Sequence, residues 1–274
     1  MGYPLRFVKL AAIPTLLTAF QGAMMTGLKG KTVLVTGASR GIGAAIARGA
    51  ADAGASLVIH AAGDSDGVRA LAEERKIPAS RVILEDLAQP RAGFRVFERA
   101  LAAAGRIDAV ANNAGLYAET PLDGPEGPWT EGWAANLAVN LQAPADLCRA
   151  AIAHYRGQGG GIVVNIASRA GHRGDAIDGA GYAASKGAIL AMTKTFARAL
   201  AGENILFYAV APGWVETRMA PKDIAARAKA VADIPLGRVA SPEEVAAMTV
   251  FLMSGACASA TGATFDINGA SYVR

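Results

Sequence analysis

The stretch from Lys31 to Ala62 constrains the fold of this chain more than any other. A short β-branched run at residues 32–35 ends at Thr36-Gly37, a small-residue helical pattern follows at 42–53, and a second apolar run occupies 56–59. The order of strand, glycine turn, helix and strand is typical of a βαβ unit. We therefore expect two neighbouring parallel strands joined by a crossover helix.

The turn between this first strand and the helix holds Gly37, Gly41 and Gly43. Gly37 lets the chain leave the strand sharply, and Gly41 and Gly43 remove side chains where a pyrophosphate and the adjoining strand approach the helix start. The free N–H groups of the helix N-terminus then face the phosphates. An ordinary structural turn is the alternative, but the place of the glycines between a strand and a helix favours nucleotide binding.

The spacing TGASRGIG resembles the TGxxxGxG turn of the short-chain dehydrogenase/reductase family rather than the GxGxxG of other Rossmann enzymes. Two later segments carry the same resemblance: NNAG at 112–115, after a predicted strand at 107–111, and YAASK at 182–186. The resemblance covers residues 29–270. It implies an α/β fold, a single Rossmann-like doubly wound parallel sheet of about seven strands over residues 29–274, with residues 1–28 as an extension. It also implies hydride transfer between a nicotinamide and a carbonyl or secondary alcohol.

Four residues match the catalytic set of that family, in its chain order: Asn140, Ser168, Tyr182 and Lys186. A separation of four places Tyr182 and Lys186 on one face of a helix. Hydride transfer to a carbonyl leaves an alkoxide that must take a proton, and a tyrosine suits this role if a nearby ammonium lowers its pKa from about 10. Ser168, at the end of a predicted strand, would stabilise the substrate oxygen.

The resemblance implies that Asn140 holds a helix distortion and a water that links Lys186 to solvent. Each of the four residues has an ordinary structural role as its alternative, such as a helix cap, a turn or a solvated face. Their joint occurrence with the glycine turn and NNAG favours catalysis.

The family's cofactor contacts carry over to residues at the predicted strand ends. They are Gly37, Ser39, Arg40, Gly41, Ile42, Gly43, His60, Ala61, Asp86, Leu87, Asn113, Ala114, Gly115, Tyr182, Lys186, Pro212, Gly213, Val215 and Thr217. Asp86 has a second role open to it, as a cap for the helical segment 90–104.

The choice between NADP(H) and NAD(H) depends on the end of the second strand, where an acidic side chain would bind the ribose hydroxyls and repel a 2′-phosphate. The family position of that acid holds Ala61, and residues 60–62 contain no carboxylate. Arg40, inside the glycine turn, can bind a phosphate with two hydrogen bonds. The sequence therefore favours NADP(H), while Asp64 and Asp66 keep NAD(H) open.

The substrate is the least determined part of the prediction. The segment 169–181 is polar and points to a polar or anionic ligand, with a solvated loop as the equal alternative. A substrate lid is expected at about 214–236, where Trp214 and Met219 either line the pocket or pack in the core. Competing functions are a 3-oxoacyl-carrier-protein reductase, which usually has basic residues near the positions of Gly159 and Glu203, an NAD-dependent alcohol or sugar dehydrogenase, and a non-catalytic nucleotide sensor.

Composition and residue spacing argue against a nucleic-acid-binding protein and against a metal site. The chain of 274 residues with 52% hydrophobic residues suits one α/β domain, and the formal charge of +4 comes from residues 1–48, which hold six basic groups and no acid. No basic cluster with aromatic residues supports nucleic-acid binding. Cys148 and Cys257 are expected to be buried free thiols in a reducing compartment, and the three histidines lack ligand spacing, so no metal is predicted.

The extension 1–28 begins with basic residues and has an apolar stretch at 10–20, as a secretory signal does. Pro14 interrupts that stretch, and a nicotinamide enzyme needs a cytoplasmic cofactor pool. We therefore expect a cytoplasmic protein in which the extension is an extra helix, or in which Met24 or Met25 is the true start. The resemblance further implies a homotetramer or a dimer.

Overall fold

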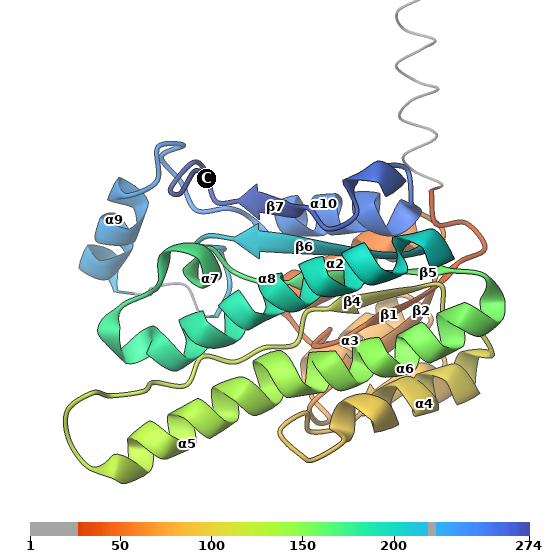
Figure 1. The fold of residues 1–274 in the computed structure, drawn as a ribbon, viewed down its shortest axis with the longest axis horizontal. Helices are drawn as coiled ribbons and strands as arrows, with labels where there is room; N and C mark the ends of the chain where they lie inside the picture. Colours follow the sequence, from red (N-terminus) through yellow and green to blue (C-terminus); the bar gives the residue numbers. More distant parts are fainter. Residues whose placement is uncertain (1–26, 219–222) are drawn as a thin grey trace, which may run out of the picture.

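The computed structural model describes residues 27–218 and 223–274. Seven strands form one parallel sheet in the order β3-β2-β1-β4-β5-β6-β7 (Figure 1). The strands are β1 (Thr32–Val35), β2 (Ser56–Ala61), β3 (Val82–Leu84), β4 (Ala109–Asn112), β5 (Gly161–Ile166), β6 (Ile205–Pro212) and β7 (Thr264–Ile267). The predicted doubly wound parallel sheet is confirmed.

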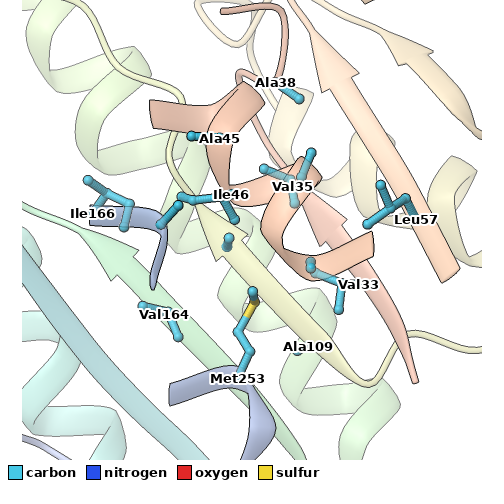
Figure 2. Packing of buried hydrophobic residues seen from close by; sticks show 14 of the residues in the cluster. Val33, Val35, Ala38, Ala45, Ile46, Leu57, Ala109, Val164, Ile166 and Met253 are labelled. Atoms are coloured by element: carbon cyan, nitrogen blue, oxygen red, sulfur yellow. The ribbon is translucent and has the colours of Figure 1, made fainter. Parts of the chain in front are cut away.

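Helices cover both faces of the sheet, and a residue's parity along its strand decides which face it meets. The first face carries α2 (Gly41–Asp52), α3 (Asp66–Glu74) and α10 (Pro242–Ser254), and the second carries α4 (Ala92–Ala104), α6 (Ala143–Gln158) and α8 (Ala180–Leu200). On β1, Val33 and Val35 pack with the first set and Leu34 with the second. Figure 2 shows Ile46 of α2 and Met253 of α10 packed over this face of the sheet.

The remaining helical segments connect these layers. They are α5 (Glu126–Leu137), α7 (Ala170–Arg173), α9 (Ile224–Ala232), the π-helical segment η3 (Ala138–Gln142), and the 3₁₀ turns η2 (Ala79–Arg81), η4 (Ile177–Gly179), η5 (Ala201–Glu203) and η6 (Ala258–Ala260). The start of the helix α10 is fixed by its own sequence, because Ser241 and Glu244 form a capping box and Pro242 occupies the first turn.

The carboxyl ends of all seven strands meet at one edge of the sheet, because every pairing is parallel. The chain winds outward in one direction from β1 and in the other from β4, and in open α/β sheets the ligand crevice lies at such a reversal, just outside the carboxyl ends of the two paired strands. The glycine turn after β1 and the NNAG segment after β4 lie on its two sides. The topology thus places both motifs at the position where open α/β sheets bind ligands.

The helical run from Glu126 to Gln158 is interrupted. Residues Ala138–Gln142 are π-helical, and the N–H of Ala143 donates to the carbonyl of Ala138, five residues earlier. Pro144 has no N–H to give to the carbonyl of Asn140, four residues before it, which helps to explain the break. The expected helix distortion at Asn140 is therefore present.

Two details of the sequence prediction need correction. Cys148 is buried, as expected, and burial raises the pKa of its thiol to about 12, but Cys257 is exposed because it precedes the surface turn η6. Leu28, assigned to the extension, is fully buried in the core beside α2.

The apolar stretch at 10–20, Pro14, Met24 and Met25 lie outside the described residues. Across the described ranges, no helix is long and apolar enough to cross a membrane.

The contact between α4 and α6 gives a test of this packing. A Cβ added at Gly93 would lie 2.2 Å from the carbonyl oxygen of Ala143 and 2.8 Å from Cβ of Asp146. We expect Gly93→Ala to lower the free energy of unfolding by about 1–3 kcal/mol, because the helices must separate. In the control Gly157→Ala, at an exposed site of α6 with no atom within 4 Å of the added Cβ, stability should be unchanged or slightly higher. Urea denaturation measures both, and equal stability of the two variants would contradict the packing.

Candidate active site

The glycines after β1 are required by contacts within the protein itself. Gly37 and Gly41 have φ angles of +66° and +52°, in the left-handed region that favours glycine. A Cβ at Gly43 would lie 2.2 Å from the carbonyl oxygen of Gly37 and 2.4 Å from Nδ2 of Asn113. The turn is therefore folded tightly against the start of α2 and against the segment after β4, which leaves backbone rather than side chains at the mouth of the crevice.

Thr36 and Asn113 join the two sides of the crevice through four close hydrogen bonds. The hydroxyl of Thr36 accepts from the backbone N–H groups of Asn113 and Ala114, each at 3.0 Å. The amide of Asn113 donates to the carbonyls of Thr36 at 2.9 Å and Gly37 at 3.2 Å. Because its amide is used in this way, the side chain of Asn113 holds the turn, and its backbone with that of Ala114 and Gly115 remains beside the crevice.

His60 has a different role from the one the sequence suggested. The side chain is 1% exposed, with Nδ1 3.3 Å from the N–H of Gly37 and Nε2 2.8 Å from the carbonyl of Glu85. This pattern requires a neutral ring in which Nδ1 accepts and Nε2 donates. Burial lowers the pKa of His60, which agrees with that form. Both ring nitrogens are occupied by backbone, so His60 braces the glycine turn rather than offering a charge to a phosphate.

The residues at the ends of β2 and β3 include three of the predicted cofactor contacts. Ala61 is buried at the last position of β2, and Leu87 is buried in the core on the side of α4. Asp86 is exposed and caps its own turn, accepting from the N–H of Ala88 at 2.9 Å. The helix α4 begins later, at Ala92, with Arg91 as its N-cap. Asp86 therefore caps the turn 86–89, and it does not cap the helix α4 as the alternative expected.

The charged side chains near the end of β2 differ in whether they have an ion-pair partner. Arg69 of α3 forms ion pairs with Asp64 and with Asp66, the latter at 2.6 Å. Arg40 is exposed as the N-cap of α2, and no described residue forms a hydrogen bond or ion pair with its guanidinium. A Cβ at Gly67 would lie 2.1 Å from the carbonyl oxygen of Ser39, so the first turn of α3 packs directly against the glycine turn. Arg40 is thus the free cation at this corner of the described structure.

The turn after β6 closes the opposite side of the crevice. Gly213 donates its N–H to the carbonyl of Ile267 at 3.0 Å, and a Cβ there would lie 2.9 Å from Cβ of Asn268. Val215 is buried and pairs with Ala240. Thr217 reaches the glycine turn, since its Cγ2 would lie 3.2 Å from a Cβ on Gly41. The segment that begins at Pro212 therefore connects the end of β6 with the N-terminus of α2.

Ser168, Tyr182 and Lys186 meet at the end of β5. The side chain of Ser168 lies near the phenol of Tyr182 and lowers its pKa, and Nζ of Lys186 lies 5.8 Å from the centroid of the Tyr182 ring. Lys186 is buried and donates to the carbonyl of Ile166, the last residue of β5, at 2.9 Å. The helix α8 supplies Tyr182 and Lys186 from one face, and the strand end supplies Ser168, as the sequence predicts.

Burial decides the electrostatics of this group. Burial raises the pKa of Tyr182, and the side chain of Ser168 opposes that rise. Burial lowers the pKa of Lys186 to about 8. The sequence argument expected the ammonium to lower the pKa of Tyr182. In the structure the pKa of Tyr182 is raised, with burial as the largest cause, while the ammonium of Lys186 gives its hydrogen bond to the carbonyl of Ile166.

Asn140 links the loop after β4 to α8. Its side chain accepts from the N–H of Leu116 and donates to the carbonyl of the same residue, both at 2.9 Å, and donates to the hydroxyl of Ser185 at 3.1 Å. A Cβ at Gly115 would lie 3.2 Å from Oδ1 of Asn140 and 3.4 Å from Nζ of Lys186. Gly115 therefore leaves a small space that both side chains border.

Two residues of the site escaped the sequence argument. Tyr117 lies beside Tyr182 with ring centroids 5.1 Å apart, and Arg169 is 6% exposed immediately after Ser168. Tyr117 comes from the loop after NNAG, where no periodicity marks it. Arg169 was noted only as part of a polar segment. Among the described residues, no group of three or more His, Cys, Asp or Glu side chains could hold a metal ion.

Comparisons with known proteins agree with this geometry. A sequence model of the family described as enoyl-(acyl carrier protein) reductase matches residues 37–270. The 3-oxoacyl-acyl-carrier-protein reductase of Thermotoga maritima is 36% identical over 250 residues, which are 88% of this chain and 98% of that protein. The chain belongs to the short-chain dehydrogenase/reductase family. It is accordingly an oxidoreductase that acts on CH–OH or C=O groups with NAD(P).

Other members of the short-chain dehydrogenase/reductase family show how varied the matches are. L-fucose dehydrogenase of Bos taurus is 35% identical over 241 residues, covering 85% of this chain and 87% of that protein. A crystal structure described as a putative NAD(P)-dependent gluconate 5-dehydrogenase from Beutenbergia cavernae, with bound NADP at low occupancy, superposes with a TM-score of 0.81 at 36% identity. It covers 89% of this chain and 98% of that one.

The environment of His60 predicts how stability responds to acid. The folded protein holds the ring neutral, with a pKa below the ordinary 6.5, whereas the unfolded chain takes up a proton as the pH falls through 6.5. Acid therefore favours unfolding below that pH. In His60→Gln, the dependence of the unfolding free energy on pH between 6.5 and 5 should be shallower by up to about 1.4 kcal/mol per pH unit.

Denaturant titrations at several pH values measure this effect. Between pH 7.5 and 8.5, where His60 is neutral in both states, the wild type and His60→Gln should show parallel pH dependence. Identical slopes below pH 6.5 would mean that His60 is not held neutral by the fold.

Proposed function

We propose that this chain reduces carbonyl compounds with NADPH, and oxidises the corresponding alcohols, with Tyr182 as the general acid and base. The observation that carries the proposal is the meeting of Tyr182, Ser168 and Lys186 beside the crevice between β1 and β4. The turn at Gly37, Gly41 and Gly43 fits a dinucleotide, because its tight packing without Cβ atoms places backbone N–H groups at the N-terminus of α2, where a pyrophosphate would bind. When bound, the nicotinamide supplies or accepts the hydride.

Each side chain then has a defined task. The hydroxyl of Ser168 donates a hydrogen bond to the substrate oxygen and stabilises the charge that develops there. Tyr182 gives its proton to the alkoxide oxygen in reduction and removes it in oxidation. Lys186, held by the carbonyl of Ile166, supplies a positive charge that stabilises the phenolate formed when Tyr182 has given up its proton.

We assign Asn140 a role in the path that returns protons from solvent to Lys186. Its side chain is used by Leu116 and Ser185, and its backbone carbonyl has no α-helical partner because residue 144 is proline. That carbonyl is available to a water between Lys186 and solvent. Tyr117 packs against Tyr182 and shields the phenol from bulk water on that side.

Replacement of Tyr182 tests the proposed mechanism. Tyr182→Phe removes the transferred proton and keeps the ring, so we expect NADPH-dependent reduction of a carbonyl panel to fall by a factor of about 10² or more. Affinity for NADPH, measured by fluorescence titration, should stay within about threefold, since the phenol contributes no charge to binding. The neighbouring variant Tyr117→Phe keeps the acid and serves as the control. Retained turnover in Tyr182→Phe would refute the assignment.

The proposed preference for NADP(H) has three supports. Arg40 is exposed at the start of α2 and has no partner among the described residues. The two acids that kept NAD(H) open, Asp64 and Asp66, are engaged by Arg69. The homologous gluconate 5-dehydrogenase structure carries NADP. A 2′-phosphate beside Arg40 would meet a free guanidinium and neutralised carboxylates.

Cofactor competition tests this preference. Arg40→Ser should lower kcat/KM for NADPH by about tenfold or more and leave kcat/KM for NADH nearly unchanged, because it removes a charge-assisted contact to the phosphate alone. Arg198→Ser is the matched control, since that exposed arginine lies near the far end of α8, about 24 Å along the helix from Tyr182. An equal loss with both cofactors, or a wild type that prefers NADH, would overturn the preference.

Acyl-carrier-protein reduction stays the second candidate, because two of the matched relatives carry that activity in their names. Near Gly159 and Glu203 this chain has an exposed ion pair, between Arg156 and Glu203, rather than free basic residues for an acidic carrier.

The homotetramer or dimer, the cytoplasmic location, the lid at about 214–236 and the extension 1–28 remain predictions. Met219 lies outside the described residues.

A further inference from the structure

Arg169 lies between the end of β5, which carries Ser168, and the turn that follows β6. It follows Ser168 directly, and its backbone N–H donates to the carbonyl of Pro212 at 2.9 Å. Its guanidinium carbon lies 6.0 Å from the ring centroid of Trp214, in the turn that follows β6. The side chain is therefore positioned at the carboxyl ends of β5 and β6, next to the strand end that carries Ser168.

The burial of this cation is not balanced by an anion of the protein. Arg169 is 6% exposed, and in the described part of the chain its side chain makes one hydrogen bond, from Nη1 to the hydroxyl of Ser271 at 2.5 Å. A guanidinium has five N–H donors, and a neutral hydroxyl gives no charge in return. The described arginines that form ion pairs, such as Arg48, Arg156 and Arg238, lie on the surface.

The charges around Arg169 do not supply the missing partner. Burial lowers the pKa of Arg169, Arg173 acts in the same direction, and Asp175 and Asp233 oppose it without forming an ion pair. An arginine stays protonated in proteins, so the positive charge persists. Buried charges are ordinarily paired, since an unpaired one is costly to desolvate. The structure thus keeps a desolvated cation next to the group that stabilises the reacting oxygen.

We infer that Arg169 binds a carboxylate carried by the substrate, so that the enzyme acts on keto acids and hydroxy acids. This inference rests on the proposed function, because it specifies the substrate class of the same site. The planar fork of a guanidinium matches a carboxylate through two parallel hydrogen bonds, and the ring of Trp214 holds the plane in place. Arg169 is a specificity-determining residue in this scheme, while Ser168 and Tyr182 carry the chemistry.

The experiment compares acids with neutral analogues of the same ketones. Initial rates with NADPH are measured for acetoacetate and methyl acetoacetate, for levulinate and methyl levulinate, and for 5-keto-D-gluconate and D-fructose. In at least one pair, the wild type should prefer the acid by about tenfold or more in kcat/KM, the factor expected for a hydrogen-bonded charge pair. Arg169→Met should remove that preference by raising KM for the acid, and Arg169→Lys should restore part of it.

Two control variants separate recognition from a structural role. Ser271→Ala releases the C-terminal tail from the guanidinium but leaves the charge, so the preference for acids should persist. Arg173→Met removes the same charge from the exposed end of α7, and the preference should change by less than about threefold, as for a screened surface charge. Calorimetry measures the binding of the preferred acid to the Tyr182→Phe variant in the presence of NADPH. This binding should be lost in the double variant that also carries Arg169→Met.

The outcomes distinguish this inference from the function on which it rests. If ketones are reduced but acids and neutral analogues are used alike, the carboxylate site is refuted and the reductase stands. Equal loss of acid and neutral substrates in Arg169→Met, or the same losses in Ser271→Ala, would show that Arg169 only fastens the C-terminal tail. If the wild type reduces no ketone although NADPH binds, both the proposed function and this inference fail.

Discussion

The hydrogen bonds between Thr36 and Asn113 hold the two halves of the doubly wound sheet together at the point where its winding direction reverses. One hydroxyl and one amide satisfy four backbone groups across the gap between β1 and β4. Buried polar groups with complete partners are rigid, because any displacement leaves one of them unpaired. The glycine turn is thereby fixed at the mouth of the crevice, and the remaining parts of the site are positioned relative to it.

A second polar chain fixes the catalytic helix to the same frame. From the loop after β4, Leu116 binds the side chain of Asn140, which in turn donates to Ser185 on α8. Behind it, Asn112 donates to Asn165 and Asn165 to Thr193, so β4, β5 and α8 are tied in sequence. Tyr182 and Lys186 therefore have a defined position against the strand ends without a contact to the glycine turn. Such preorganisation is what a proton transfer at fixed distance requires.

Two cations are buried at this edge of the sheet. Lys186 meets a backbone carbonyl and Arg169 a hydroxyl, and neither forms an ion pair with a carboxylate of the described residues. Desolvation of a charge costs free energy unless an opposite charge or strong dipoles are nearby. The proposed chemistry supplies negative charge at both places: the phenolate of Tyr182 beside Lys186, and a substrate carboxylate beside Arg169. Under the proposed function, these two negative charges would offset the desolvation of both cations.

The sequence by itself determined the βαβ start with its two parallel strands, the turn with three glycines, and the shared helix face of Tyr182 and Lys186, while the rest of the sheet was implied by the family resemblance. These features follow from spacing along the chain, where strand and helix periods decide which side chains align. Tertiary structure alone decided that His60 is a neutral brace, that burial raises the pKa of Tyr182, and that Arg169 is buried without a counterion. The physical reason is that burial and hydrogen-bond partners come from segments distant in the sequence, such as Glu85 for His60 and Ser271 for Arg169. Local patterns carry no information about such contacts.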